Sequence, residues 1–286
     1  MTGWSGKTQV YGIFGDPVAH SLSPAMHNAA FAALGLDAVY VPFHVLPEGL
    51  PAAIAGLRAL RIAGINLTVP HKEAVLPLLD EVDPLARQIG AVNTLVVRDR
   101  RLVGYNTDGL GFLQSLQQDL QLAPAGRSVL VLGAGGAARA AVFSLAGQGA
   151  QRLVIANRTR ARAQQLATSV RAWVTGIHVE AVTLEDDLSR IASGCDLVVN
   201  TISAGLKDEG FQLLDWSKIT ASVKLFDMLY SANVMPMVRV ARETGHQATD
   251  GLGMLAGQGE EAFRLWTGQP PPPGLMHDIL VSRRLG

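Results

Sequence analysis

The sequence predicts a two-domain α/β protein with largely parallel sheets. Its 286 residues correspond to two domains at roughly 150 residues per domain. Short apolar runs alternate with longer amphipathic segments from one end of the chain to the other, which is the pattern of strand–helix–strand units. The segment 120–127 contains Pro and Gly and precedes a strongly apolar run, which indicates that a second unit begins there.

The elements of the first part follow from this alternation. Residues 10–14 form an apolar run typical of a strand. Ser23 followed by Pro24 is typical of a helix start, with Ser23 as the N-cap of a helix that ends near Leu34. The elements expected next are, in order, a strand at 39–45, a helix at 50–61, a strand at 63–69, a helix at 73–79, a hairpin of 91–98 with 101–105, and a helix at 110–120.

The second part repeats the pattern, beginning with a strand at 129–132 and an Ala-rich helix at 137–146. Further strands are expected at 153–156, 179–182, 197–200 and 223–227, and a further helix at 236–245. Four consecutive prolines at 270–273 form a stiff extended spacer before a last helix at 275–284.

The composition argues against several functional classes. Lys+Arg and Asp+Glu both number 24, and this balance argues against a nucleic-acid-binding protein and against a polybasic membrane-surface protein. The single cysteine excludes an internal disulfide framework and a cysteine-based zinc site, and we expect no bound metal. The apolar runs are shorter than the ~20 residues of a membrane helix, and the first residues do not resemble a signal peptide. We therefore expect a soluble, cytoplasmic protein.

A glycine-rich turn directly follows the strand at 129–132 and opens a helix. It reads G-x-G-x-x-A over residues 133–138, which is the dinucleotide-binding fingerprint in its strand–turn–helix context. The glycines permit a tight turn, and the helix N-terminus offers free N–H groups to a pyrophosphate. The alternative is a glycine-rich turn without a ligand. The residues predicted to form the cofactor turn are Gly133, Ala134, Gly135, Gly136 and Ala137.

The end of the next strand, at 153–156, indicates which dinucleotide is bound. Sites specific for NAD usually carry Asp or Glu there, which binds the ribose hydroxyls. This strand is followed instead by Asn157, Arg158 and Thr159, and then by Arg160 and Arg162. Arginine forms charge-assisted hydrogen bonds to a 2′-phosphate, so the segment favours NADP over NAD. The alternative is that these arginines only line a solvated helix start.

Four polar clusters follow apolar runs in the first 108 residues, at 21–23, 66–72, 91–94 and 106–108. Ligands of open α/β sheets bind beyond the carboxyl ends of the strands, so these clusters could converge on one pocket. Lys72 stands out because the chain has five lysines against nineteen arginines, and burial can lower the pKa of a lysine side chain. Lys72 and Asp108 could together transfer a proton. On this chemistry alone, a surface lysine and a helix-capping aspartate remain an equal alternative.

Seven blocks of the sequence resemble the shikimate dehydrogenase family. They lie, in order, at 14–24, 66–72, 91–94, 105–109, 133–137, 157–159 and 251–259. The similarity extends from about residue 10 to residue 268, and seven ordered blocks do not agree by chance. The resemblance implies an NADP-dependent oxidoreductase that acts on a CH–OH group. Its small-molecule substrates would be 3-dehydroshikimate and shikimate, in the biosynthesis of aromatic amino acids.

The resemblance also implies roles for the matching residues. Lys72 and Asp108 match the catalytic pair of the family. Ser21, Ser23 and Tyr230 match the groups that hold the substrate carboxylate. The groups that bind the ring hydroxyls are matched by Asn66, Thr68, Asn93 and Gln258. The adenosine 2′-phosphate site is matched by Asn157, Arg158, Thr159 and Arg162, and the nicotinamide site by Met228 and Gly251.

The order of the motifs implies how the domains divide. Residues 1–108 would form a substrate-binding catalytic domain, completed by the C-terminal helices of 251–286. Residues 109–250 would form a Rossmann-type NADP-binding domain. The sequence leaves open whether the protein is a monomer or a homodimer.

Three alternatives remain beside this interpretation. The first is a quinate/shikimate dehydrogenase of the same superfamily with dual substrate or NAD use, which the absence of an acid after Ala156 disfavours. The second is an enzyme for a modified shikimate, to which the departures Ala232 and Met235 from the family pattern add slight weight. The third is a non-catalytic protein of the same fold, which would be expected to have lost Lys72 or Asp108.

Overall fold

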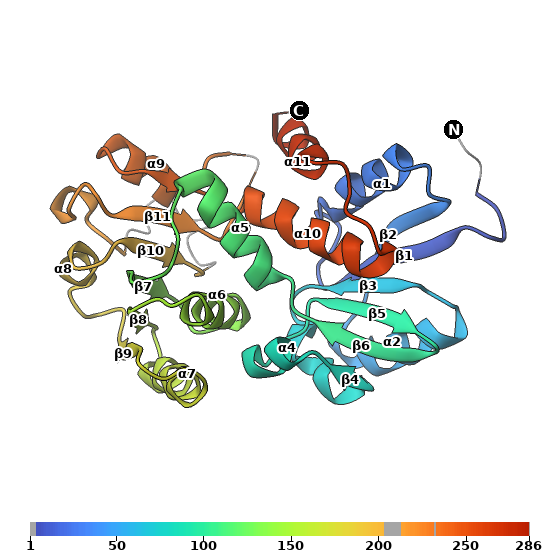
Figure 1. Ribbon diagram of the computed structural model, residues 1–286, viewed down its shortest axis with the longest axis horizontal. Coiled ribbons are helices and arrows are strands. Elements are labelled where there is room, and N and C mark those ends of the chain that lie inside the picture. Colours follow the sequence, from blue (N-terminus) through green and yellow to red (C-terminus); the bar gives the residue numbers. More distant parts are fainter. Residues whose placement is uncertain (1–3, 203–212, 232, 286) are drawn as a thin grey trace. The chain divides into compact units, whose positions relative to one another are not determined.

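The computed structural model describes residues 4–202, 213–231 and 233–285, and the chain divides into two compact units (Figure 1). Unit 1 comprises Met1–Asp108 and Ala256–Gly286, and unit 2 comprises Gly109–Leu255. Both units combine a six-stranded sheet with helices, so the predicted two-domain α/β class is confirmed. The chain returns to unit 1 at Ala256, inside a helix.

The sheet of unit 1 has the strand order β2-β1-β3-β5-β6-β4. Strand β5 is antiparallel to both of its neighbours and the other pairs are parallel, so the sheet is largely parallel, as expected, with one antiparallel strand. The cause is the hairpin that reverses the chain between β5 and β6. The elements are β1 (Gln9–Gly15), α1 (Ser23–Ala33), β2 (Ala38–His44), α2 (Leu50–Ala59), β3 (Gly64–Leu67), α3 (His71–Ala74), β4 (Glu81–Val82), α4 (Pro84–Ile89), β5 (Thr94–Arg98), β6 (Arg101–Tyr105), α10 (Leu252–Thr267) and α11 (Leu275–Leu285), with short 3₁₀ turns at Pro47–Gly49 and Leu76–Leu78.

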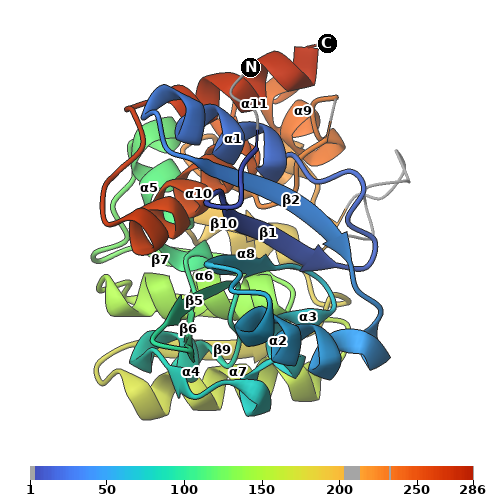
Figure 2. The same ribbon diagram turned by 90° about the vertical axis from the view of Figure 1, so that its right-hand side faces the viewer.

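Helices cover both faces of this sheet because successive side chains of a strand point to opposite sides. On β1, Phe14 belongs to a core that includes Leu57 of α2. Tyr11 of the same strand faces the other side, where its ring lies 5.1 Å from those of Phe31 in α1 and Trp266 in α10. Helix α11 lies beside α1 (Figure 2).

Two local expectations for unit 1 are wrong. The helix expected at 73–79 is the short α3 followed by a 3₁₀ turn at Leu76–Leu78. The cause is Pro77, which has no N–H to donate and whose ring would clash with the preceding turn of an α-helix. The expected N-cap Ser23 is instead the first residue of α1, and the N-cap position is occupied by Leu22 without a side-chain cap.

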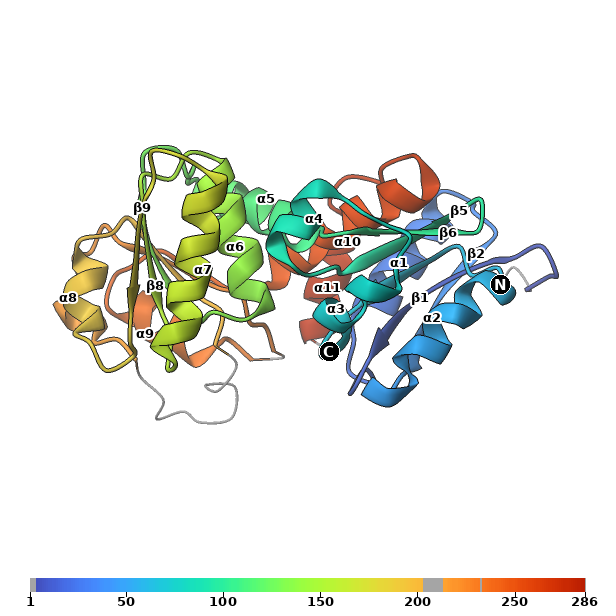
Figure 3. The ribbon, with the colours of Figure 1, turned by 90° about the horizontal axis from the view of Figure 1, so that it is seen from below.

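The sheet of unit 2 is parallel throughout, in the order β12-β11-β10-β7-β8-β9. Helices α6 and α7 lie together on one side of its strands, and α8 and α9 lie on the other (Figure 3). The elements are α5 (Asp108–Leu120), β7 (Ser128–Leu132), α6 (Gly136–Gly147), β8 (Arg152–Ala156), α7 (Arg160–Trp173), β9 (His178–Val182), α8 (Leu188–Ser193), β10 (Leu197–Asn200), a 3₁₀ turn at Trp216–Lys218, β11 (Lys224–Asp227), α9 (Pro236–Glu243) and β12 (Ala248–Thr249).

The strand order of unit 2 is that of a dinucleotide-binding sheet. Counted along the chain from β7, the strands lie in the order 3-2-1-4-5-6, with the change of direction between β7 and β10. Ligands of such sheets bind beyond the carboxyl ends of the strands at this point. In the ranges that the structure describes, none of the helices is both long enough and apolar enough to span a bilayer.

Candidate active site

The strand register of unit 1 gathers three of the four polar clusters. Asn66, at the end of β3, pairs with Thr94 at the start of β5, and Thr94 pairs with Tyr105 at the end of β6. The residues that directly precede β5 and follow β6 therefore lie at the same edge as the end of β3. This edge carries Asn66, Asn93, Thr107 and Asp108, all of which are buried.

Lys72 and Asp108 form an ion pair at this edge. The Nζ of Lys72 lies 2.6 Å from Oδ2 of Asp108, and the two side chains are 25% and 9% exposed. Lys72 lies on α3, and its carbonyl accepts a hydrogen bond from the N–H of Val92 at 2.8 Å, which ties the helix to the cluster at 91–94. The arrangement contradicts the alternative of an ordinary surface lysine.

Asn93 connects this ion pair to its surroundings. Its Nδ2 donates to Oδ1 of Asp108 at 2.8 Å and approaches Oε1 of Gln258, in α10, at 3.4 Å. Its Oδ1 accepts from the backbone N–H of Thr107 at 2.8 Å. Asp108 therefore receives a hydrogen bond on each carboxylate oxygen, one from an ammonium group and one from an amide. The predicted residues Lys72, Asp108, Asn93 and Gln258 thus belong to one polar cluster.

Asn66 is held by three hydrogen bonds. Its Nδ2 donates to the carbonyl of Asn93 at 3.1 Å and to Oγ1 of Thr94 at 3.0 Å. Its Oδ1 accepts from the hydroxyl of Tyr40 at 2.7 Å. Since both amide hydrogens are already donated, Asn66 can offer only its oxygen to a ligand.

The two serines lie before and at the start of α1. Ser23 is buried, and its backbone N–H donates to Oγ of Ser21 at 3.3 Å. Burial raises the pKa of Tyr40 well above its usual range, and a hydrogen bond with the Ser23 side chain acts in the opposite direction. Thr68 follows the end of β3, and its methyl group packs so closely on Gly15 that a Cβ at residue 15 would overlap it.

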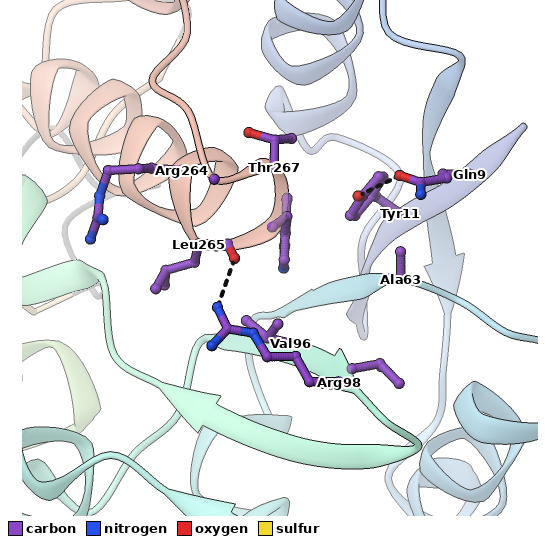
Figure 4. Close-up of a pocket in the computed structure, with 11 residues that line it drawn as sticks. Gln9, Tyr11, Ala63, Val96, Arg98, Arg264, Leu265 and Thr267 are labelled. Carbon is purple, nitrogen blue, oxygen red and sulfur yellow. Dashed lines mark hydrogen bonds between the residues drawn. The ribbon is translucent and has the colours of Figure 1, made fainter.

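A cavity of about 490 Å³ lies at the opposite ends of strands β1 and β3 in unit 1 (Figure 4). Gln9 and Tyr11 line it, and the Tyr11 hydroxyl donates to Oε1 of Gln9 at 3.0 Å. Arg98 reaches the carbonyl of Leu265 at 3.4 Å. The residues that line this cavity include none of the predicted site residues, so the polar cluster around Asp108 is the candidate active site of unit 1.

The glycine-rich turn of unit 2 fits a diphosphate. Gly133 has a φ of +111°, and a Cβ there would overlap Oγ1 of Thr201, so this position requires glycine. Gly135 is the N-cap of α6 and has no side chain to occupy the first N–H groups of the helix. A Cβ built on Gly135 would have open space around it. The backbone N–H groups of Gly136, Ala137 and Ala138 are therefore available to an anionic group.

The predicted 2′-phosphate site lies at the end of β8. Asn157 is partly buried and donates from Nδ2 to the carbonyl of Thr159 at 2.9 Å. Arg158, Thr159 and Arg162 are exposed. Within the described ranges, neither Arg158 nor Arg162 forms an ion pair with a carboxylate, so the positive charge of both is available to a phosphate.

The remaining predicted residues of unit 2 lie after β11. The backbone of Gly251 approaches that of Met228 so closely that a Cβ at residue 251 would overlap the Met228 carbonyl. Tyr230 belongs to the same segment, and burial raises its pKa. Met235, one of the two departures from the family pattern, is buried in the core beside α9, whereas Ala232 lies outside the described residues.

Two side chains beside the predicted site residues were not recognised from the sequence. Tyr40 and Thr94 hold Asn66, but neither was singled out. Thr94 stands next to Asn93 in a cluster that was recognised from the sequence, so this position could have identified it. No sequence signal identified Tyr40, because a tyrosine in an apolar strand looks like a core residue.

The fold and the two sites define the class of protein. A parallel dinucleotide-binding sheet with a free glycine-rich turn, together with a second unit that carries a Lys–Asp pair, is typical of nicotinamide-dependent oxidoreductases. Family models match both units: the shikimate dehydrogenase substrate binding domain at residues 13–95, shikimate / quinate 5-dehydrogenase at 115–207, and the shikimate 5′-dehydrogenase C-terminal domain at 251–280.

Known proteins of similar sequence and structure agree with these models. The chain is 51% identical over 284 residues to a shikimate dehydrogenase (NADP(+)) of Geobacter sp. strain M21, with 98% of this chain and 97% of the relative covered. A solved shikimate 5-dehydrogenase of Thermus thermophilus, in complex with NADP(H) and shikimate, has a TM-score of 0.86 and 38% identity over 97% of this chain and 100% of its own. A quinate dehydrogenase of Corynebacterium glutamicum in complex with NAD has a TM-score of 0.87 and 31% identity, with 96% of this chain and 99% of that protein covered. The chain belongs to the shikimate dehydrogenase family.

Proposed function

We propose that this protein catalyses the reversible NADPH-dependent reduction of 3-dehydroshikimate to shikimate, in the biosynthesis of aromatic amino acids. The observation that carries the proposal is the ion pair between Lys72 and Asp108, which lies inside a buried amide network in unit 1. The order of the site motifs and the identity to NADP(+)-dependent relatives support the same activity.

Lys72 is the proton donor in the direction of reduction. When bound, NADPH would supply the hydride for the C3 carbonyl carbon. As negative charge develops on the carbonyl oxygen, Nζ of Lys72 gives it a proton, and in the reverse direction Nζ takes the hydroxyl proton back. Asp108 keeps Nζ in place through the 2.6 Å contact and accepts a hydrogen bond from the substrate hydroxyl. Asn93 fixes the Asp108 carboxylate from the other side.

The remaining polar residues orient the substrate. Ser21, Ser23 and Tyr230 are the proposed donors to its carboxylate, and Thr68, Asn93 and Gln258 bind the ring hydroxyls. Asn66 acts toward a hydroxyl only as an acceptor, because both of its amide hydrogens are donated within the protein. Unit 1 is therefore the proposed substrate-binding catalytic domain.

Unit 2 is the proposed NADP-binding domain. The free N–H groups at the start of α6 would hold the diphosphate, and Asn157, Arg158, Thr159 and Arg162 would hold the 2′-phosphate. Met228 and Gly251 would line the nicotinamide. The absence of a carboxylate at the end of β8 supports this cofactor over NAD, and with it the shikimate enzyme over a dual-specificity quinate/shikimate enzyme.

The setting of the activity is also a proposal. A biosynthetic reaction that consumes NADPH fits the cytoplasm, and we propose that the enzyme acts there as a monomer or a homodimer. The equal numbers of acidic and basic residues support small molecules, and not nucleic acid, as its partners.

Replacement of Lys72 tests the role assigned to it. Lys72→Met is expected to lower kcat by about 10²–10⁴-fold, the contribution of general acid–base catalysis, and to leave KM for shikimate within a few-fold. Lys7→Met, at an exposed position of the same unit, is the matched control and should retain full activity. A large rise in KM with unchanged kcat would instead make Lys72 a binding residue only.

A further inference from the structure

A continuous chain of buried hydrogen bonds runs from β2 to Asp108. The Tyr40 hydroxyl donates to Oδ1 of Asn66 at 2.7 Å, and Nδ2 of Asn66 donates to Oγ1 of Thr94 at 3.0 Å. Thr94 in turn donates to Oδ1 of Asn93 at 3.0 Å, and Nδ2 of Asn93 donates to Asp108 at 2.8 Å. Tyr40 is 1% exposed and Thr94 is 0% exposed, so the chain is shielded from water.

Backbone groups fix the direction of every bond in this chain. Nδ2 of Asn66 faces the carbonyl of Asn93, which can only accept, so the amide of Asn66 cannot be flipped. Oδ1 of Asn93 faces the N–H of Thr107, which can only donate, so the amide of Asn93 cannot be flipped either. The Thr94 hydroxyl accepts from Asn66, and its own hydrogen is therefore free for Asn93. All donors consequently point toward the Asp108 carboxylate.

We propose that Thr94 and Tyr40 are positioning residues of the reaction: their hydroxyls hold the amides of Asn66 and Asn93 so that Asn93 stays on Asp108 and Asp108 stays on Lys72. The inference rests on the proposed function of Lys72 and Asp108. Neither hydroxyl contacts the reacting atoms. Each acts through the amide beside it.

These hydroxyls are important because they belong to a buried hydrogen-bond network. Hydrogen bonds that point the same way polarise one another, and in a low-dielectric interior each is stronger than in water. Removal of the Thr94 hydroxyl leaves a hydrogen of Asn66 without a partner and withdraws a donor from Asn93, in a region that water does not reach. The amide of Asn66 then keeps only Tyr40 and the Asn93 carbonyl, and the oxygen of Asn93 keeps only the N–H and hydroxyl of Thr107, so both amides are held less tightly. Catalysis is sensitive to such displacements, because proton transfer requires the donor to be held at the reacting oxygen.

The proposal is tested first at Thr94. Thr94→Val has the same shape but no hydroxyl, and kcat for shikimate oxidation is expected to fall about tenfold, the factor that corresponds to one ordinary hydrogen bond. KM for shikimate is expected to stay within about threefold, since Thr94 does not touch the substrate. Thr94→Ser restores the hydroxyl and should return kcat to within about twofold of the wild type.

Tyr40 provides the second test. Tyr40→Phe removes only the hydroxyl and should lower kcat about threefold to tenfold. This loss is expected to be smaller than that of Thr94→Val, because the amide of Asn66 keeps its bond to the Asn93 carbonyl. Because both hydroxyls bond the amide of Asn66, the double variant is expected to be no worse than about twofold below Thr94→Val, which is a non-additive result.

Two matched controls in unit 1 separate positioning from general loss of stability. Tyr11→Phe removes a buried hydroxyl that bonds Gln9 at the opposite end of the sheet, and Thr267→Val removes one that bonds Phe263 in α10. Both should retain kcat even where the melting temperature falls. An unchanged kcat in Thr94→Val, or equal losses of kcat in Thr94→Val and Thr94→Ser, would overturn the positioning role. The proposed function would still stand as long as the wild-type protein is active. A wild-type protein that is inactive with shikimate and NADP would overturn the function itself.

Discussion

In the proposed NADP site, Arg158 is the residue on which the choice of cofactor would depend most. It is exposed at the end of β8, and within the described residues it has no carboxylate partner, so a 2′-phosphate would form a charge-assisted bond of about 1.5–3 kcal/mol there. Arg158→Ala is therefore expected to raise KM for NADP about tenfold to a hundredfold and to leave KM for NAD unchanged. Arg190→Ala, at an exposed position on α8, is the control. A parallel rise in both KM values would show that Arg158 does not contact the 2′-phosphate.

Asp227 makes the stability of unit 2 depend on pH. It is 1% exposed, and burial raises its pKa from 3.8 to about 7, with a small contribution from Asp250 and with hydrogen bonds from Leu229 and Asn200 acting in the opposite direction. Between pH 4 and 7 the folded protein holds a proton that the unfolded chain has lost, so stability decreases as pH rises and levels off above pH 7.

Asp227→Asn removes this titration and keeps an oxygen for the N–H of Leu229. Between pH 5 and 8 the wild type should lose about 2–3 kcal/mol of unfolding free energy relative to the variant, measured by urea denaturation. Parallel pH profiles of the two proteins would mean that Asp227 is ionised in the folded state across this range.

Single residues could be predicted from the sequence when they belong to a recognisable motif. Lys72 and Asn93 lie in clusters that follow strands, and the scarcity of lysine marked Lys72. Tyr40 and Thr94 contact Asn66 from 26 and 28 residues away, and such contacts depend on strand register, which the sequence alone does not specify.

At the scale of elements, helix α10 is held on unit 1 by a close contact with strand β3. The indole of Trp266 lies against Gly64, where a Cβ would overlap it, and Nε1 donates to the carbonyl of Leu95 at 2.9 Å. Gly64→Ala is expected to lower the unfolding free energy by about 1–3 kcal/mol, the usual cost of overpacking. The measurement is urea denaturation followed by tryptophan fluorescence.

The control for this prediction is Gly56→Ala on α2. The nearest atom to a Cβ there is Cδ1 of Leu60 at 3.9 Å, so the methyl group has room, and alanine should raise stability by about 0.4–1 kcal/mol. If the two variants were equally stable, the packing of Trp266 on β3 would not be as close as the structure has it.

Most elements were predictable because their hydrophobic period is regular. The strands of unit 2 that were expected from the sequence agree with β7 to β11 within a residue or two. Helix α4 was missed although Asp83 caps its first N–H groups and Gly90 ends it in the left-handed conformation. It has only six residues, too few for a hydrophobic period to be recognised.

At the scale of the whole molecule, the order of the motifs predicted two domains, and the structure has two compact units. The motifs that resemble substrate-binding blocks of the family precede Asp108, those that resemble its cofactor-binding blocks lie between Gly133 and Gly251, and Gln258 lies again in unit 1. The chain returns to unit 1 inside helix α10, where neither composition nor a turn signal marks a boundary. The hairpin of β5 and β6 in unit 1 was predicted, and it makes β5 antiparallel in an otherwise parallel sheet.

The central claim is that the whole protein is an NADP-linked shikimate dehydrogenase, and one measurement tests it directly. Initial rates of cofactor reduction are recorded with shikimate and with quinate, each with NADP and with NAD. A strong rate is expected only with shikimate and NADP, because the proposed 2′-phosphate site contains arginine and no acid. Comparable rates with quinate or with NAD would contradict the account and assign the protein to a dual-specificity enzyme, and no rate in any combination would point to a modified substrate.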